Sequence, residues 1–188
     1  MAILILGLAL FCAVHLIPTA RPHTRAALAE RFGEGGFKIG YTVVSLIGLL
    51  LMIYGYGAAA GGPILWFPPP FLVHVNNLLM LVAVGIFIAG PFGGAVARAI
   101  RHPQLIGLKT WAIAHLLVNG DLRSLVLFGG LLAWAVVSVI MINKRDGARV
   151  KPEPAARTRD LAHAGAAVVV FLAVTAAHNW LGVWPFPG

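Results

Sequence analysis

The chain has few charged residues, and acidic ones are the scarcest. Of its 188 residues, 11% are charged and six are Asp or Glu. An ordinary soluble domain carries about 25% charged residues, so this composition excludes a soluble globular fold. All six acids lie in predicted loops or at helix ends, which excludes proton or cation transport along intramembrane carboxylates. No Ser-His-Asp or Cys-His constellation is evident either.

Cysteine is nearly absent as well. The single Cys12 lies inside an apolar run. An intrachain disulfide is therefore excluded, and cysteine usage does not indicate the redox compartment.

The chain has apolar runs instead, with 60% hydrophobic residues. Each run is uncharged through its centre and long enough, or nearly so, for a hydrocarbon core of about 30 Å. The first run lacks the basic start of a signal peptide, so we expect it to stay uncleaved. A shorter run that carries Lys109 predicts one further helix. The predicted helices are residues 2–17, 39–60, 71–96, 105–118 (the short one), 125–142 and 162–183.

Basic residues predict the topology. All fourteen Lys and Arg except Arg123 fall in three clusters, at residues 21–38, 98–109 and 144–159. Such clusters stay on the cytoplasmic side, and an even number of crossings must separate the second from the third. The short helix is therefore expected to cross. The predicted fold is an all-α, integral membrane six-helix bundle with a short fourth helix and both termini on the outer face. The lipid bilayer is the expected partner, and no nucleic acid.

Two segments outside the predicted spans carry information. Residues 25–32 are amphipathic enough for a helix lying at the membrane interface. Residues 144–160 (KRDGARVKPEPAARTRD) are charged and rich in Pro and Ala, which is typical of a flexible cytoplasmic linker. We expect this linker to lie within a single domain that spans residues 1–188.

Two of the seven histidines lie inside apolar helices, where a histidine needs a bonding partner. Both follow an aromatic residue by four positions and a glycine by eight, so the three side chains share one helix face. Glycine would leave a slot, the aromatic ring a stacking surface and the imidazole an axial ligand, as in a haem pocket. The alternative is a packed histidine that donates to a backbone carbonyl. The two faces are Gly7, Phe11, His15 and Gly107, Trp111, His115.

The other histidines are at predicted boundaries. His74 and His178 both fall near the outer boundary and form an alternative metal-binding pair. Imidazoles wetted by lipid headgroups would be the simpler explanation for them. His23 and His163 fall in basic loops, where we expect solvated side chains.

An Arg-His-Pro tripeptide opens the short helix. Arg101 is suited to an anionic headgroup or a haem propionate, so Arg101 and His102 are candidate cofactor-binding residues. A similar tripeptide contributes to cofactor binding in membrane methyltransferases. The acidic residues expected after the last helices of such enzymes are absent, which leaves a methyltransferase as the alternative function.

Taken together, RHPQLIGLKTWAIAHLLVNGD at residues 101–121, FCAVHLIPTAR at the end of the first helix and FGEGGFKIGYTVVSLIGL resemble the NnrU membrane-protein family. Plant and cyanobacterial 15-cis-zeta-carotene isomerases are its more distant relatives. The resemblance implies a link to nitrite and nitric oxide reduction in denitrification. The isomerase relatives carry haem b, and the resemblance places its ligands at His15 and His115. Their alternative cysteine ligand corresponds to Ala112 here.

The resemblance and the residues together predict a multi-pass protein of the bacterial inner membrane that binds haem b, with Phe11 and Trp111 beside the ligands. We expect isomerase-like or redox chemistry on a lipophilic substrate, or a non-catalytic assembly or sensing role beside nitrogen-oxide respiratory proteins. The sequence assigns no catalytic residue.

Overall fold

The structure is a computed structural model that describes residues 1–186. It is all-helical, as predicted, with one isolated β-bridge between Ile64 and Asp121 among those residues. The chain forms two compact units. The first combines Met1–Leu65 with Asp121–Asp146, and the second combines Trp66–Gly120 with the chain from Gly147 onward.

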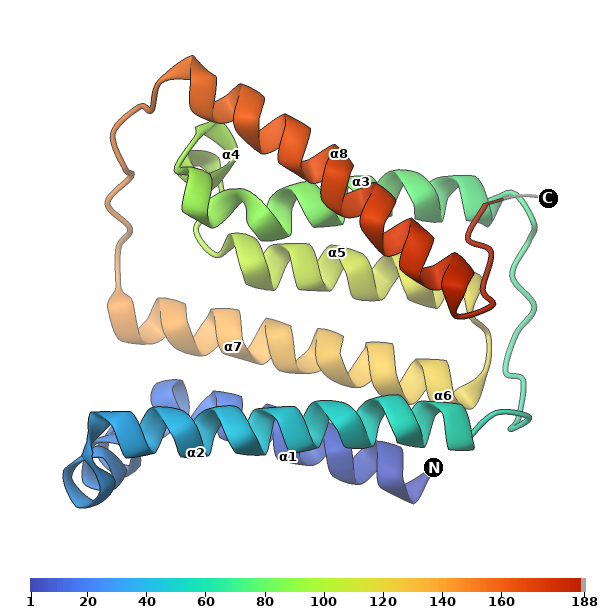
Figure 1. The fold of residues 1–188 in the computed structure, drawn as a ribbon. Helices are drawn as coiled ribbons and strands as arrows, with labels where there is room; N and C mark the ends of the chain where they lie inside the picture. The colour runs from blue at the N-terminus through green and yellow to red at the C-terminus, as the bar shows by residue number, and fades with distance from the viewer. Residues whose placement is uncertain (187–188) are drawn as a thin grey trace. The chain divides into compact units, whose positions relative to one another are not determined.

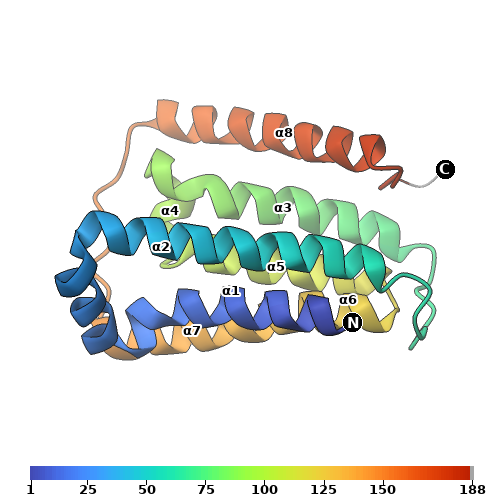
Figure 2. The ribbon, with the colours of Figure 1, turned by 60° about the horizontal axis from the view of Figure 1, so that its bottom comes forward.

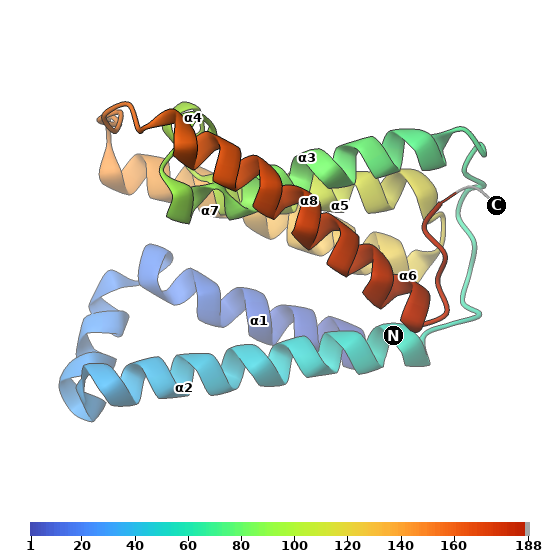
Figure 3. The same cartoon turned by 45° about the horizontal axis from the view of Figure 1, so that its top comes forward.

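The first unit is built on a helical hairpin. Helix α1 (Ala2–Ala20) is followed after Arg21 by α2 (Pro22–Ala58), and the two run antiparallel in close contact (Figure 3). Pro22 is suited to a first helical turn because its missing N–H would have had no partner there. Helix α7 (Gly130–Asp146) packs against α1 (Figure 2). It is preceded by a single turn, α6 (Leu122–Ser124), and by a π-helix, η1 (Leu125–Gly129).

Helix α2 bends sharply at Gly33. Its φ of 74° and ψ of 159° lie in a region that glycine adopts far more readily than other residues. The bend divides α2 into an amino-terminal arm, residues 22–32, and a long apolar helix. The two segments predicted as helices, residues 25–32 and 39–60, fall on either side of it.

Small residues allow α1 and α2 to touch through their backbones. A Cβ atom added at Gly7 would lie 2.6 Å from Met52 N, and one at Gly55 would lie 2.7 Å from Leu4 Cα. Glycine at such contacts is common between membrane helices. The open slot predicted beside Gly7 is therefore wrong, because α2 fills it.

The second unit contains α3 (Leu72–Phe92), α4 (Ala95–Ala99), α5 (Pro103–Val118) and α8 (Arg157–Trp180). Helices α5 and α8 both contact α3 (Figure 1). A Cβ atom at Gly107 of α5 would lie 2.7 Å from Phe87 N of α3. Here too the slot predicted beside the histidine-bearing helix is wrong, because a neighbouring helix occupies it.

Helix α3 ends earlier than predicted, at Phe92 rather than at residue 96. The cause is Gly93, whose φ of 62° is left-handed and terminates the helix. The next turn, α4, is tied to α8 because Ala95 N–H donates to Asp160 Oδ1 at 2.7 Å.

Within the part of the chain that the structure describes, five helices are long and apolar enough to span a membrane: Ala2–Ala20, Pro22–Ala58, Leu72–Phe92, Leu122–Asp146 and Arg157–Trp180. This agrees with a multi-pass membrane protein. Helix α5, with 16 residues, is shorter than these five. The sixth crossing and the placement of both termini stay predictions.

Helices take up both ends of the predicted linker, since α7 extends to Asp146 and α8 begins at Arg157. Residues 147–156 between them lack regular structure. Arginines hold them in the second unit: Arg149 donates to Ala97 O at 2.8 Å, and Arg98 donates to Pro152 O at 3.0 Å. The flexibility of this segment stays a prediction.

Candidate functional site

His15 lies among aromatic rings in the first unit. The Phe11 ring stacks on it with centroids 4.0 Å apart and planes inclined by 28°. Tyr41 of α2 and Trp134 of α7 contribute rings at 5.0 Å and 5.6 Å from the imidazole. The spacing predicted that Phe11 and His15 share one helix face, and the contact between their rings agrees with this.

Two buried polar atoms on α7 accompany this group. Trp134 Nε1 and Ser138 Oγ have no hydrogen-bond partner among residues 1–186. The two residues are four apart and so share one face of α7. Buried polar atoms without a partner are uncommon in proteins, so these two suit a polar group of a ligand.

His115 lies beside His178 in the second unit. The ring centroids of these residues are 6.4 Å apart, with planes inclined by 39°. Trp111 contacts His115 from the previous turn of α5 at 4.9 Å. The structure also places His115 next to His178, a contact that sequence reasoning did not predict; the pairing of His178 with His74 stays a prediction.

All three of these histidines bind the backbone in the same way. Nδ1 lies 2.8 Å from Phe11 O in His15, 3.0 Å from Trp111 O in His115 and 2.8 Å from Val174 O in His178. A carbonyl oxygen only accepts, so Nδ1 carries the proton in each ring. In the neutral imidazole Nε2 then holds the lone pair. Metal-bound histidines characteristically donate the other ring N–H in this manner.

His163 differs from these three, and the prediction that it is solvated is wrong. Only 7% of His163 is exposed, and its Nε2 donates a hydrogen bond to Gly85 O of α3 at 2.7 Å. The Phe92 ring lies 5.3 Å from it. His163 therefore joins α8 to α3, whereas His23 is exposed as predicted.

The remaining predicted site residues lie near the ends of helices in the second unit. His74 is exposed in the first turn of α3. His102 is the residue before α5, and its carbonyl accepts from Ile106 N–H at 2.9 Å. Arg101 donates from Nη1 to Gly147 O at 2.7 Å, so its guanidinium holds the segment that follows α7.

Sequence reasoning missed Tyr41 and Trp134 as neighbours of His15. They come from two other helices, and contact between helices cannot be deduced from a helix face alone. One signal was available for Trp134. It lies in the middle of an apolar run, whereas membrane tryptophans concentrate at the interfaces.

These observations can be set beside known proteins. A search of curated proteins and a search of solved structures gave no match. The family model described as NnrU protein matches residues 3–185, which is nearly the whole chain. The chain, with its histidine-bearing helices α1 and α5, therefore belongs to the NnrU family.

Proposed function

We propose that this NnrU-family protein binds haem b in the bacterial inner membrane. The observation that carries the proposal is the shared geometry of His15, His115 and His178. Each commits Nδ1–H to a carbonyl one turn earlier, which places the lone pair of the neutral imidazole on Nε2, the atom that would bind a metal. Haem iron in proteins commonly takes such histidines as axial ligands.

His115 is the proposed first ligand. The contact with Trp111 on its own helix and the short distance to His178 make it the best-supported of the three. Two residues are the candidates for a second ligand. His178 lies in the same unit, and His15 carries the same glycine, aromatic and histidine face on α1.

Three aromatic rings around His15 support haem binding there. Phe11, Tyr41 and Trp134 offer flat apolar surfaces, and the unpartnered Trp134 Nε1 and Ser138 Oγ offer polar atoms. When bound, haem supplies an iron that can change its oxidation state or bind a small molecule. The protein residues would set its orientation and exclude water.

We further propose a role in nitrite and nitric oxide reduction, as a redox component or as an assembly or sensing factor beside respiratory proteins. Membership of the NnrU family supports this role. Isomerase-like chemistry on a lipophilic substrate is the enzymatic form of the same proposal. The methyltransferase alternative depends on the Arg-His-Pro tripeptide. The guanidinium of Arg101 in this tripeptide already donates a hydrogen bond to Gly147 O.

Single substitutions identify the ligands. His115→Ala should lower the ratio of Soret to protein absorbance in detergent-purified protein, and so should the variant of the true partner, either His15→Ala or His178→Ala. Added imidazole should restore part of the lost absorbance. His23→Ala is the control, because His23 is exposed on the amino-terminal arm of α2. A wild-type spectrum for His115→Ala would contradict the assignment.

A further inference from the structure

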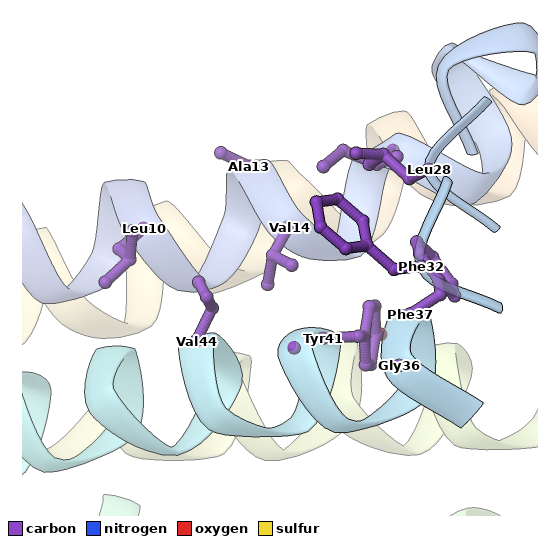
Figure 4. Close-up of a pocket in the computed structure, with 11 residues that line it drawn as sticks. Leu10, Ala13, Val14, Leu28, Phe32, Gly36, Phe37, Tyr41 and Val44 are labelled. Carbon is purple, nitrogen blue, oxygen red and sulfur yellow. The ribbon is translucent and has the colours of Figure 1, made fainter. Parts of the chain in front are cut away.

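The first unit contains an open apolar cavity that no histidine lines. Its volume is about 340 Å³, within the range of roughly 300–1,000 Å³ usual for ligand sites. Leu10 and Val14 of α1 face Tyr41 and Val44 of α2, and the Phe32 ring points into the space between the helices (Figure 4). The cavity lining is almost entirely apolar.

The bend at Gly33 creates this cavity. It folds the arm of α2 back so that Leu28 and Phe32 line one side. An exposed ion pair joins the two sides of the bend, since Arg25 Nη2 lies 2.6 Å from Glu34 Oε2. The Arg25 guanidinium also lies 5.1 Å from the centroid of Phe37, another lining residue.

Glycine gives the cavity its width. Gly36 and Gly40 line the cavity from α2, and larger side chains at these positions would project into the cavity. A Cβ atom at Gly40 would meet nothing within 4 Å. The space beside Gly40 is thus open to an apolar chain, and a side chain placed there should occupy it.

The border of the cavity is basic. Residues 21–38 carry four Lys or Arg and two Glu. Glu34 is bound to Arg25. Arg31 lies 5.2 Å over the ring of the lining residue Phe32 and forms no ion pair within residues 1–186. Basic residues beside membrane spans attract anionic lipids.

We propose that the cavity holds one acyl chain of an anionic phospholipid, with the phosphate on Arg31. A chain leaving a bilayer gains no hydrophobic energy, since lipid tails are as apolar as the cavity. The preference for one phospholipid over the others in the bilayer therefore comes from packing of its acyl chain in the cavity and from the charge of its headgroup. No histidine lines this cavity, and Tyr41 borders both the cavity and the aromatic group around His15.

Native mass spectrometry of the delipidated, detergent-purified protein tests the proposal, with phosphatidylglycerol and phosphatidylcholine as probes. Wild-type protein should retain phosphatidylglycerol in preference to phosphatidylcholine. Gly40→Leu should lose the lipid-bound peak. Gly57→Leu is the matched control, since Gly57 lies on the same helix and also has open space at its Cβ position. Arg31→Gln should abolish the preference between the two lipids.

Equal retention by Gly40→Leu and Gly57→Leu would overturn the proposal, as would equal retention of both lipids by the wild type. A measurement on the wild type alone covers the case in which Gly40→Leu does not fold. Phosphatidylglycerol with a photoreactive acyl chain should label peptides from residues 10–17 or 28–44. Labelling confined to other peptides would also overturn the proposal. The Soret band, recorded on the same samples, reports separately on haem.

Discussion

At the scale of single residues, the histidines form two groups, according to which ring nitrogen bonds a backbone carbonyl. His15, His115 and His178 each bond a carbonyl of their own helix through Nδ1. His163 instead uses Nε2 to bond a carbonyl of another helix. The first arrangement places the lone pair of the neutral imidazole on Nε2, and the second joins two helices. Composition and spacing do not distinguish them.

His163→Ala should destabilise the protein. The substitution removes the bond to Gly85 O between α8 and α3 and leaves a cavity, at a cost of about 1–3 kcal/mol. The apparent melting temperature in mild detergent should fall, while the ratio of haem to folded protein should stay unchanged. His23→Ala serves as the control. Equal melting temperatures for the two variants would show that the bond contributes little.

Gly55→Ala should weaken the hairpin of α1 and α2. The added Cβ would press on the backbone of Leu4, and overpacking of this kind typically costs about 1–3 kcal/mol. Gly57→Ala, two residues later, has open space and should be neutral. Thermal stability of the purified variants measures the difference. A stable Gly55→Ala protein would mean that the two helices can separate without loss.

At the scale of elements, the positions of the apolar helices were largely predictable. Their lengths follow from the hydrocarbon thickness, which the sequence must match. Their ends were less predictable, because single residues decide them. Gly93 ends α3 in a left-handed conformation, and Gly33 bends α2. Nothing in the hydropathy pattern indicated the π-helix at Leu125–Gly129, which depends on a shift in backbone hydrogen bonding.

Asp121 begins the helix that leads into this π-helix. Its Oδ1 accepts from Ser124 N–H at 2.8 Å, and the carboxylate also lies 3.5 Å from Arg123 Nε. Asp121→Ala should cost about 0.5–2 kcal/mol through loss of the helix cap. Asp121→Asn keeps an accepting oxygen and should retain most of the stability. If both variants melt alike, the charge rather than the cap is what matters.

At the scale of the whole molecule, the fold class followed from composition, and the neighbours of the candidate site did not. A chain with 60% hydrophobic residues cannot cover its surface with polar groups. The face of Phe11 and His15 was predictable because it lies within one helix. Tyr41 and Trp134 join it through tertiary packing, as His178 joins His115, and no local pattern encodes those contacts.

The basic residues predict that the carboxyl end lies outside the cytoplasm. A fluorescent reporter that matures only in the cytoplasm should give no signal when fused after Gly188. The same reporter inserted between residues 147 and 156 should fluoresce, because that segment lies between two basic helix ends. Fluorescence from the first fusion would contradict the six-crossing topology.

The central claim is that this membrane protein carries haem b, and its absorption spectrum tests the claim most directly. Protein should be produced with haem precursor supplied, purified in mild detergent and analysed as the pyridine haemochrome. We expect a Soret band and the haemochrome bands of haem b, with a constant ratio of haem to protein across the size-exclusion peak. Folded, monodisperse protein without a Soret band, even after incubation with haemin, would contradict the account.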